Sequence, residues 1–507
     1  MENRTEKSIK NIIYAIIGQF SGIIISLISR LAFVKILSSE YLGLSSLFTN
    51  ILTILSLAEL GFGTAMACEL YKPISNNDVY LIKSLMKLYK KIYIWIGIII
   101  IALGIITIPL YPSFINEKPD IENLDFIYLL FVINAAVSYF FAYKRLLIIS
   151  DQKKYIDTIY KYVFYFILNV LQILVLIIFK NYILFLITQT IMIIVENFAI
   201  SIKANKLYPY LKEKDIGTVP KECKDRITQN VRALFFHKFG GVVLNSTDNI
   251  VISKVLGLAL VGIYSNYYLI INALNTMVAQ FFNSIVASIG NLGATSTKEK
   301  VTEVFEKIFF ANFWIYAVCC TCLVSLFNPF IEIWLGSEYL IDIYTVIIIV
   351  INFYILGMRR TLMAFREATG NYSKDWYSPI IEAIINIGAS IILAKYLGLA
   401  GVFLGTIISS LFTNFWIEPL VVTKKTLTFG LKEYLLQHFK YTILTVCICI
   451  AVYCINSIFI GNSLIIFLVK TLISLIVPNI ILLVIYRKDK KFLFYINFIK
   501  QKIFKKN

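Results

Sequence analysis

Long apolar runs recur along almost the whole chain, and they constrain its fold more than any other feature. Each run is close to the roughly 20 residues that a helix needs to cross a bilayer, and charged residues or Pro, Gly and Asn clusters separate the runs. Because backbone polar groups find no water inside a bilayer, a helix is the expected conformation of each run. We therefore predict an all-α polytopic membrane protein of about 14 transmembrane helices. The predicted spans are 11–36, 42–66, 92–111, 125–148, 158–179, 182–202, 231–256, 260–290, 308–327, 341–364, 375–396, 398–420, 441–460 and 463–486.

Composition excludes a soluble globular protein. Apolar residues make up 59% of the 507 positions and charged residues only 15%, against about 45–50% and about 25% in soluble domains. Six of the eight cysteines lie within apolar runs, where a thiol behaves as a small hydrophobic group. No spacing of Cys and His indicates a zinc site, so neither a metal nor a cofactor is expected.

The distribution of basic residues predicts the topology of the chain. If both termini face the cytoplasm, the cytoplasmic segments carry 40 of the 48 Lys and Arg residues and the outer segments carry 5. This asymmetry follows the positive-inside rule and would be lost if one span were removed. The net charge of +18 is therefore explained mostly by topology, and we expect no nucleic-acid partner. The predicted location is the bacterial cytoplasmic membrane, with both termini inside.

The first and second halves of the chain are similar when one is shifted by 219 residues against the other. Under this shift Lys35 aligns with Lys254 and Gly43 with Gly262. A stripe of polar residues at helical spacing on the first span also has a counterpart on the seventh. The stripes are Gln19, Gly22, Ser26, Ser29 and Arg30 on the first, and Lys238, Gly241, Asn245, Asp248 and Asn249 on the seventh.

A repeat unit of six spans is even-numbered, so both copies cross the membrane in the same direction, as in transporters with parallel repeats. The predicted domains are an N-terminal six-helix lobe, a cytoplasmic linker, a C-terminal six-helix lobe, a second linker, two additional helices and a basic cytoplasmic tail. Their boundaries are 1–202, 203–230, 231–420, 421–440, 441–486 and 487–507.

Three segments resemble the bacterial polysaccharide flippases, in the superfamily that also includes the multidrug and toxin extruders. They are SLAELGFGTAM (56–66), NSTDNIVISKVLGLALVGIYSNYY (245–268) and REATGNYSKDWYSPIIEAIINIGASIILAKYLG (366–398). The resemblance extends over nearly the whole chain, and it implies two six-helix lobes around a central cavity. It also implies the cargo, an oligosaccharide on a polyprenyl diphosphate that moves from the inner to the outer leaflet by alternating access for cell-surface polysaccharide export.

The resemblance implies a transporter and not an enzyme, one that acts beside glycosyltransferases and a polysaccharide polymerase and contacts membrane lipids. The sequence has no G-x-x-x-x-G-K-[ST] phosphate loop, which argues against direct use of ATP. A multidrug or cation antiporter of the same superfamily is the main alternative. A membrane-embedded transferase or polymerase acting on lipid-linked sugars is a weaker one, since no acid or histidine pair stands out.

A diphosphate that crosses the membrane needs cations in place of its hydration. Arg30 and Lys238 lie within spans, on the polar stripes, and Arg359 and Arg360 lie near the inner end of the tenth span. A cation at the bilayer centre costs about 2.5–3.5 kcal/mol on insertion scales and usually faces a wet cavity. The alternative for Arg30 and Lys238 is that each pairs with an acid and holds helices together. The alternative for Arg359 and Arg360, which lie close to the surface, is that they are topology charges. Amides that could bind sugar hydroxyls, or join helices, are Asn245, Asn249, Asn272 and Asn275.

Acidic residues within the spans are candidates for coupling. Glu59, Asp248 and Glu382 are each expected either to bind H⁺ or Na⁺ or to serve as counter-ions for Arg30 and Lys238. The membrane potential is a third source of driving force. The sequence leaves open the sugar unit, the carrier lipid, the coupling ion and the oligomeric state.

The polar stripes lead to the first prediction. Replacing Arg30 and Lys238 together by alanine should strongly reduce transport, because both candidate counter-charges for the diphosphate are lost. Transbilayer movement of a labelled lipid-linked sugar in vesicles measures the effect, with membrane insertion as the control. Near-normal transport by the double variant would contradict this site assignment.

Overall fold

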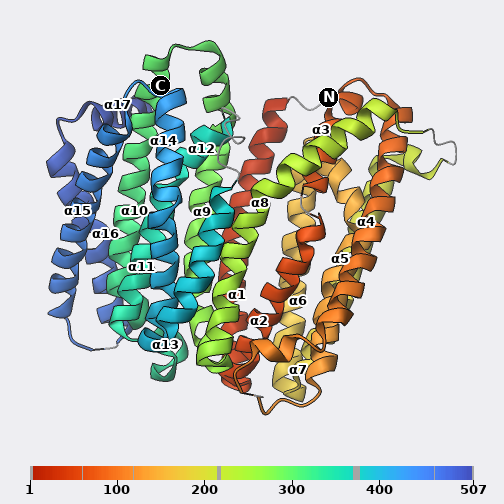
Figure 1. The fold of residues 1–507 in the computed structure, drawn as a ribbon, viewed down its shortest axis with the longest axis horizontal. Coiled ribbons are helices and arrows are strands. Elements are labelled where there is room, and N and C mark those ends of the chain that lie inside the picture. The colour runs from red at the N-terminus through yellow and green to blue at the C-terminus, as the bar shows by residue number, and fades with distance from the viewer. Residues whose placement is uncertain are drawn as a thin grey trace. The chain divides into compact units, whose positions relative to one another are not determined.

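The computed structural model of the protein describes residues 4–59, 61–117, 119–213, 218–368, 377–461 and 463–504. Over these residues the chain forms helices and short 3₁₀ turns, with no β-strand. It divides into two compact units, Met1–Gly262 and Ile263–Asn507. Figure 1 shows the long helices of each unit running roughly alongside one another, as the predicted all-α membrane fold requires.

The first unit is built from long helices that pair across the bundle. Within it α1 packs on α6, α4 on α5, and α5 on α7, and α8 lies against α2 and α3. Its helices are α1 (Arg4–Ile36), α2 (Ser39–Leu55), η1 (Ser56–Glu59), α3 (Phe62–Ser75), α4 (Val79–Thr107), η2 (Tyr111–Phe114), α5 (Leu124–Ser150), α6 (Lys154–Phe179), α7 (Tyr182–Leu207), η3 (Pro209–Lys212) and α8 (Lys221–Leu256).

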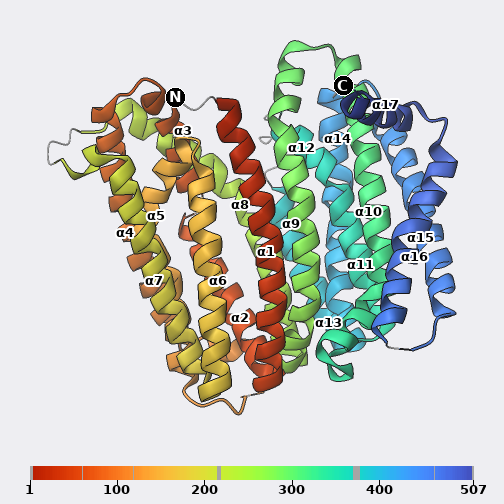
Figure 2. The same ribbon diagram turned by 180° about the vertical axis from the view of Figure 1, so that it is seen from behind.

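The second unit is centred on α10, which packs against α11, α15 and α16. Figure 2 shows the last helix, α17, lying across the end of this bundle. Most of α9 belongs to the second unit, although the helix begins before Gly262. The helices are α9 (Leu258–Thr295), α10 (Lys298–Leu335), η4 (Ser337–Tyr339), α11 (Ile343–Met358), α12 (Arg360–Ala368), α13 (Ser378–Phe412), α14 (Asn414–Thr426), α15 (Leu431–Ser457), α16 (Leu464–Tyr486) and α17 (Lys490–Phe504).

Within the described residues every predicted span is helical, on one helix or on consecutive helices, and the eleventh and most of the twelfth span share α13. Among the described residues, nine helical segments are long and apolar enough to cross a membrane, or ten if a bent pair in α5 counts as one span. The chain is therefore a multi-pass membrane protein. Most helices extend past the predicted ends, because polar residues such as Lys83 in α4 continue the helix into the interface.

Several spans are interrupted where the sequence predicts a continuous run. The second span breaks at η1, and the next helix begins after Gly61, whose φ of 92° suits glycine. In the tenth span α11 ends and α12 begins at Arg359, whose own φ and ψ of -68° and -19° are helical, and the twelfth span is interrupted at Thr413, whose backbone is not helical. The predicted turn between the eleventh and twelfth spans occurs at Gly398, with φ of 59°.

The structure divides the chain after Gly262, whereas the predicted linker between lobes is 203–230. The division reflects the contacts of α8, which packs on α2 and α3 and whose Arg226 binds the Glu69 carboxylate of α3 through two hydrogen bonds of 3.0 and 2.8 Å. The predicted lobe boundaries stay a prediction, because contacts alone do not show which segments move together.

Two glycines that align under the 219-residue shift meet each other in the first unit. A Cβ atom on Gly43 would lie 1.9 Å from the carbonyl oxygen of Leu258, and one on Gly262 would lie 1.9 Å from that of Ser39. Ser39 and Leu258 are also related by the shift. The starts of α2 and α9 therefore cross as a two-fold related pair, and only glycine permits so close an approach of two backbones.

This crossing gives the second prediction. Gly262→Ala should destabilise the protein, because the added Cβ must push the start of α2 away. Gly388→Ala is the matched control, since a Cβ at Gly388 meets nothing within 4 Å. Thermal unfolding in mild detergent measures both, and equal stability of the two variants would refute the close contact.

Candidate functional site

The two most buried acids of the described residues, Glu382 and Glu418, lie in the second unit with an arginine between them, near the ends of the predicted tenth to twelfth spans. Arg359 follows the last residue of α11, Glu382 is in the first turns of α13, and Glu418 is in α14. The side chains are 11%, 4% and 4% exposed. We call these three residues the second-unit clasp.

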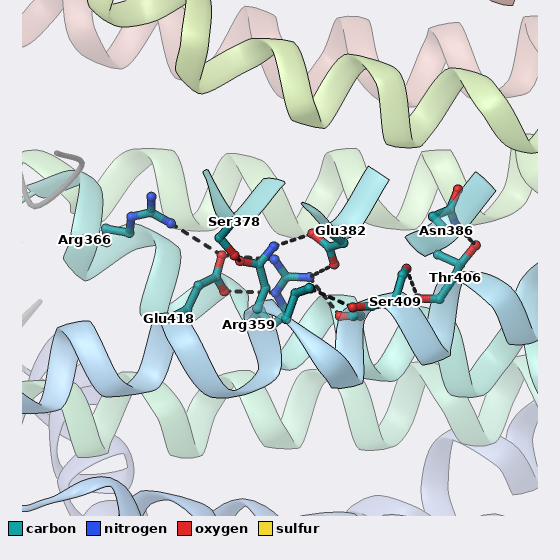
Figure 3. Close-up of polar contacts among 11 residues, drawn as sticks. Arg359, Arg366, Ser378, Glu382, Asn386, Thr406, Ser409 and Glu418 are labelled. Carbon is teal, nitrogen blue, oxygen red and sulfur yellow. Dashed lines mark hydrogen bonds and ion pairs between the residues drawn. The ribbon is translucent and has the colours of Figure 1, made fainter. Parts of the chain in front are cut away.

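The Arg359 guanidinium donates three hydrogen bonds to the two acids and a fourth to a serine (Figure 3). Its Nε and Nη2 donate to the two carboxylate oxygens of Glu418, at 2.9 and 3.0 Å. Its Nη1 donates to Oε1 of Glu382 at 3.1 Å and to the Ser410 hydroxyl at 3.0 Å. A planar fork matched to a carboxylate makes a strong, directional pair, which an ammonium group could not reproduce.

Neighbouring polar groups complete the clasp. Asn414 donates its amide N–H to the second oxygen of Glu382, and Ser378 donates its hydroxyl to the Asn414 carbonyl at 2.5 Å. Arg366 of α12 adds a second cation 3.6 Å from Glu418. Two arginines thus balance two glutamates. A balanced, bonded cluster can persist inside a protein, where one unpaired charge could not.

The clasp changes how two predicted residues are interpreted. Arg359 is predicted to contact the cargo and Glu382 to couple an ion or act as a counter-ion, and the structure joins them in one ion pair. Because the donors of Arg359 are taken by protein acceptors, the residue has little capacity left for a diphosphate. The geometry is that of a structural ion pair, an alternative that the sequence left open for Glu382 but did not predict for Arg359.

Arg360, the next residue, has a different environment. Its Nε donates to the Tyr316 hydroxyl at 3.0 Å, and its Nη2 donates to the Asn275 amide oxygen at 3.3 Å. Both partners are neutral, and no described acid forms an ion pair with this half-buried arginine. Within the described part of the chain the positive charge of Arg360 is therefore uncompensated, and a predicted amide, Asn275, lies beside it.

In the first unit the predicted residues are separated. Arg30 is half-buried on α1, near Tyr165 and Tyr182. Glu59 lies at the η1 break, where its carboxylate accepts hydrogen bonds from the hydroxyls of Tyr93 at 2.5 Å and Tyr139 at 3.2 Å. The structure thus places this acid between tyrosines of α4 and α5.

The remaining predicted residues are on α8 and α9. Asp248 and Asn249 are half-buried on α8, and the Oδ1 atom of Asn249 has no hydrogen-bond partner in the described structure. Asn272 is exposed on α9. The side chains of Lys238 and Asn245 lie outside the described residues, so their predicted roles stay predictions. Among the described residues no group of three or more His, Cys, Asp or Glu side chains could hold a metal.

Sequence reasoning missed Arg366, Ser378 and Asn414 as members of this cluster. Glu418 stands out in the sequence as an acid within an apolar run, but its partner is 59 residues away. Asn414 follows the non-helical Thr413, and polar residues at a break in a membrane helix are the one local signal that could have identified it.

The fold is shared with lipid flippases and multidrug transporters of known structure. The lipid II flippase MurJ, in an inward closed conformation, matches with a TM-score of 0.68 at 17% identity, over 94% of this chain and 99% of that chain. An inward-facing multidrug resistance MATE family transporter of the MOP superfamily matches with a TM-score of 0.58 at 14% identity, over 77% and 91%. A point mutant of the Vibrio cholerae MATE transporter VcmN has a TM-score of 0.58 at 12% identity, over 83% and 97%.

No protein-family model matches the sequence, and no curated protein matches it significantly. The structural matches confirm the predicted fold class, and they confirm the resemblance to flippases and extruders at the level of the fold. At identities this low they establish the fold alone.

The clasp gives the third prediction. Arg359→Met should lower the free energy of unfolding by about 3–5 kcal/mol, because it leaves Glu382 as an uncompensated buried charge. Lys300→Met is the matched control. It breaks an ion pair whose side chains are 55% and 48% exposed, and such a pair contributes about 0–1 kcal/mol. Denaturant unfolding in mild detergent measures both, and equal losses would show that the clasp does not stabilise the unit.

Proposed function

We propose that this membrane protein is a flippase that moves oligosaccharide units linked to a polyprenyl diphosphate from the inner to the outer leaflet of the bacterial cytoplasmic membrane, with both chain termini inside. The observation that carries the proposal is Arg360, a half-buried cation within a membrane helix pair whose described partners are a hydroxyl and an amide. Such residues are rare in membranes and usually mark a substrate or ion pathway.

The chemistry of the Arg360 surroundings suits a diphosphate-linked sugar. Arginine presents several N–H donors in a fork that matches phosphate oxygens, and two of its nitrogens donate here to neutral groups that an anion could displace. The amide of Asn275 and the hydroxyl of Tyr316 could then bind sugar hydroxyls. The structural likeness to a lipid II flippase supports this class of cargo.

The direction of transport is consistent with the membrane potential. A diphosphate carries about two negative charges, and moving each one outward through an inside-negative potential releases about 2.3 kcal/mol per 100 mV. The potential could therefore drive export, while a coupled ion would reset the empty carrier. Glycosyltransferases that build the lipid-linked unit and a polymerase that consumes it are the expected partners.

A multidrug antiporter is the second candidate, favoured by the MATE transporters with the same fold. A cation exporter needs an acidic or aromatic site for its cargo, and an uncompensated arginine would repel that cargo. Measuring resistance to cationic dyes separates the two functions. Energy-dependent dye export by the native protein, without movement of the lipid-linked sugar, would overturn the flippase proposal.

The proposal gives the fourth prediction. Arg360→Gln should raise the apparent KM for the diphosphate-linked sugar by about tenfold, the effect of losing about 1.4 kcal/mol of binding free energy. Lys432→Gln, at an exposed position of α15, is the control and should leave KM unchanged. Flipping by the full-length protein in vesicles measures both. An unchanged KM for Arg360→Gln would remove Arg360 from the site.

A further inference from the structure

The first unit contains an ionic cluster built like the second-unit clasp. Arg145 donates from Nη1 to Asp157 at 3.0 Å and from Nη2 to Glu196 at 2.5 Å. Its Nε donates to the amide oxygen of Asn197 at 3.3 Å. We call Arg145, Asp157 and Glu196 the first-unit clasp. It is more exposed than the second, at 19%, 14% and 20%.

The two clasps occupy equivalent places in the predicted repeat. The arginine lies near the end of the fourth span of its half, in the last turns of α5 in the first unit and directly after α11 in the second. The first acid lies in the first turns of the fifth span, in α6 or α13. The second acid lies in the sixth span, in α7 or α14. In both units one arginine therefore joins three consecutive spans near the same end of the bundle.

The duplication is hidden in the sequence because the connections differ in length. Arg145 and Asp157 are 12 residues apart, whereas Arg359 and Glu382 are 23 apart. The second unit thus has 11 more residues between these partners than the first, and α12 lies within this longer connection. A single shift of 219 residues therefore aligns the first two spans of each half but not the clasps.

We infer that Arg145 and Arg359 are equivalent ion-pairing residues of the repeat, and that Arg359 is in addition a positioning residue, because the second-unit clasp fixes the α11–α12 junction from which Arg360 reaches its site. Arg359 and Arg360 are consecutive, so the bonds that hold one arginine to α13 and α14 also orient the backbone of the other. Arg360 extends in turn to Tyr316 on α10 and Asn275 on α9. The role of Arg360 in this inference rests on the proposed function, whereas the two clasps do not depend on it.

A positioning role differs from a purely stabilising one in what it does to substrate affinity. If Arg359 acts on the cargo only through Arg360, weakening the clasp has no further effect once Arg360 is neutral. If the clasp only stabilises the fold, the two effects on KM are independent. The first-unit clasp provides the control, because it has the same chemistry and does not precede Arg360.

The experiment compares Arg359→Lys, Arg360→Gln, the double variant and Arg145→Lys in the full-length protein in vesicles. Lysine keeps the charge but loses the two-pronged contact with Glu418. We expect Arg359→Lys to raise KM for the diphosphate-linked sugar several-fold, the double variant to match Arg360→Gln alone, and Arg145→Lys to keep the native KM. The positioning role would be overturned if the increases in KM of the two single variants multiplied in the double variant. It would also be overturned if Arg145→Lys raised KM as much as Arg359→Lys does.

Hydrogen exchange of peptides covering α11 and α12 separates this inference from the proposed function. Arg359→Lys should speed exchange there and Arg145→Lys should not. Faster exchange together with an unchanged KM for Arg360→Gln would refute the proposed site and leave the clasp standing. Native exchange and KM in Arg359→Lys, alongside a raised KM in Arg360→Gln, would refute the clasp alone. Ser410→Ala, which removes one acceptor of Arg359, replaces Arg359→Lys if that variant does not fold.

Discussion

The cost of leaving a charge unpaired in hydrocarbon governs the polar architecture of this protein. Two adjacent arginines meet that cost in opposite ways. Arg359 is surrounded by carboxylates and makes four hydrogen bonds to protein acceptors. Arg360 keeps its charge and binds only a hydroxyl and an amide among the described residues. The first solution stabilises a helix junction, and the second leaves a site at which an anion would be bound favourably.

Both environments depend on the interruption of helices that the apolar pattern predicts to be continuous. The break at Arg359 separates α11 from α12, and the break at Thr413 starts α14. At the second break Asn414 is held by Ser378 and in turn binds Glu382. The polar cluster therefore lies where the helices are interrupted, and its side chains are bonded to one another.

Internal duplication explains why the close glycine contact and the ionic cluster each involve equivalent residues from both halves of the chain. The glycine pair Gly43 and Gly262 brings the starts of α2 and α9 into backbone contact. The clasps of Arg145 and Arg359 each join the fourth, fifth and sixth spans of one half. The first-unit clasp is the more exposed of the two. Both halves of the repeated fold therefore keep an arginine that joins three helices. Arg360, which forms no ion pair among the described residues, is found in the second half alone.

The sequence by itself determined the helical membrane fold, because apolar length and charge asymmetry are local properties of each segment. It also identified Arg359, Arg360, Asn275 and Glu382 as polar residues within apolar surroundings. Only the tertiary structure decided which arginine is neutralised. Arg359 and Arg360 are neighbours in the chain, but they bind different residues, which lie 23 to 85 positions away in the sequence. An ion pair forms where side chains from different helices converge, and that convergence depends on packing and helix breaks that no single segment encodes.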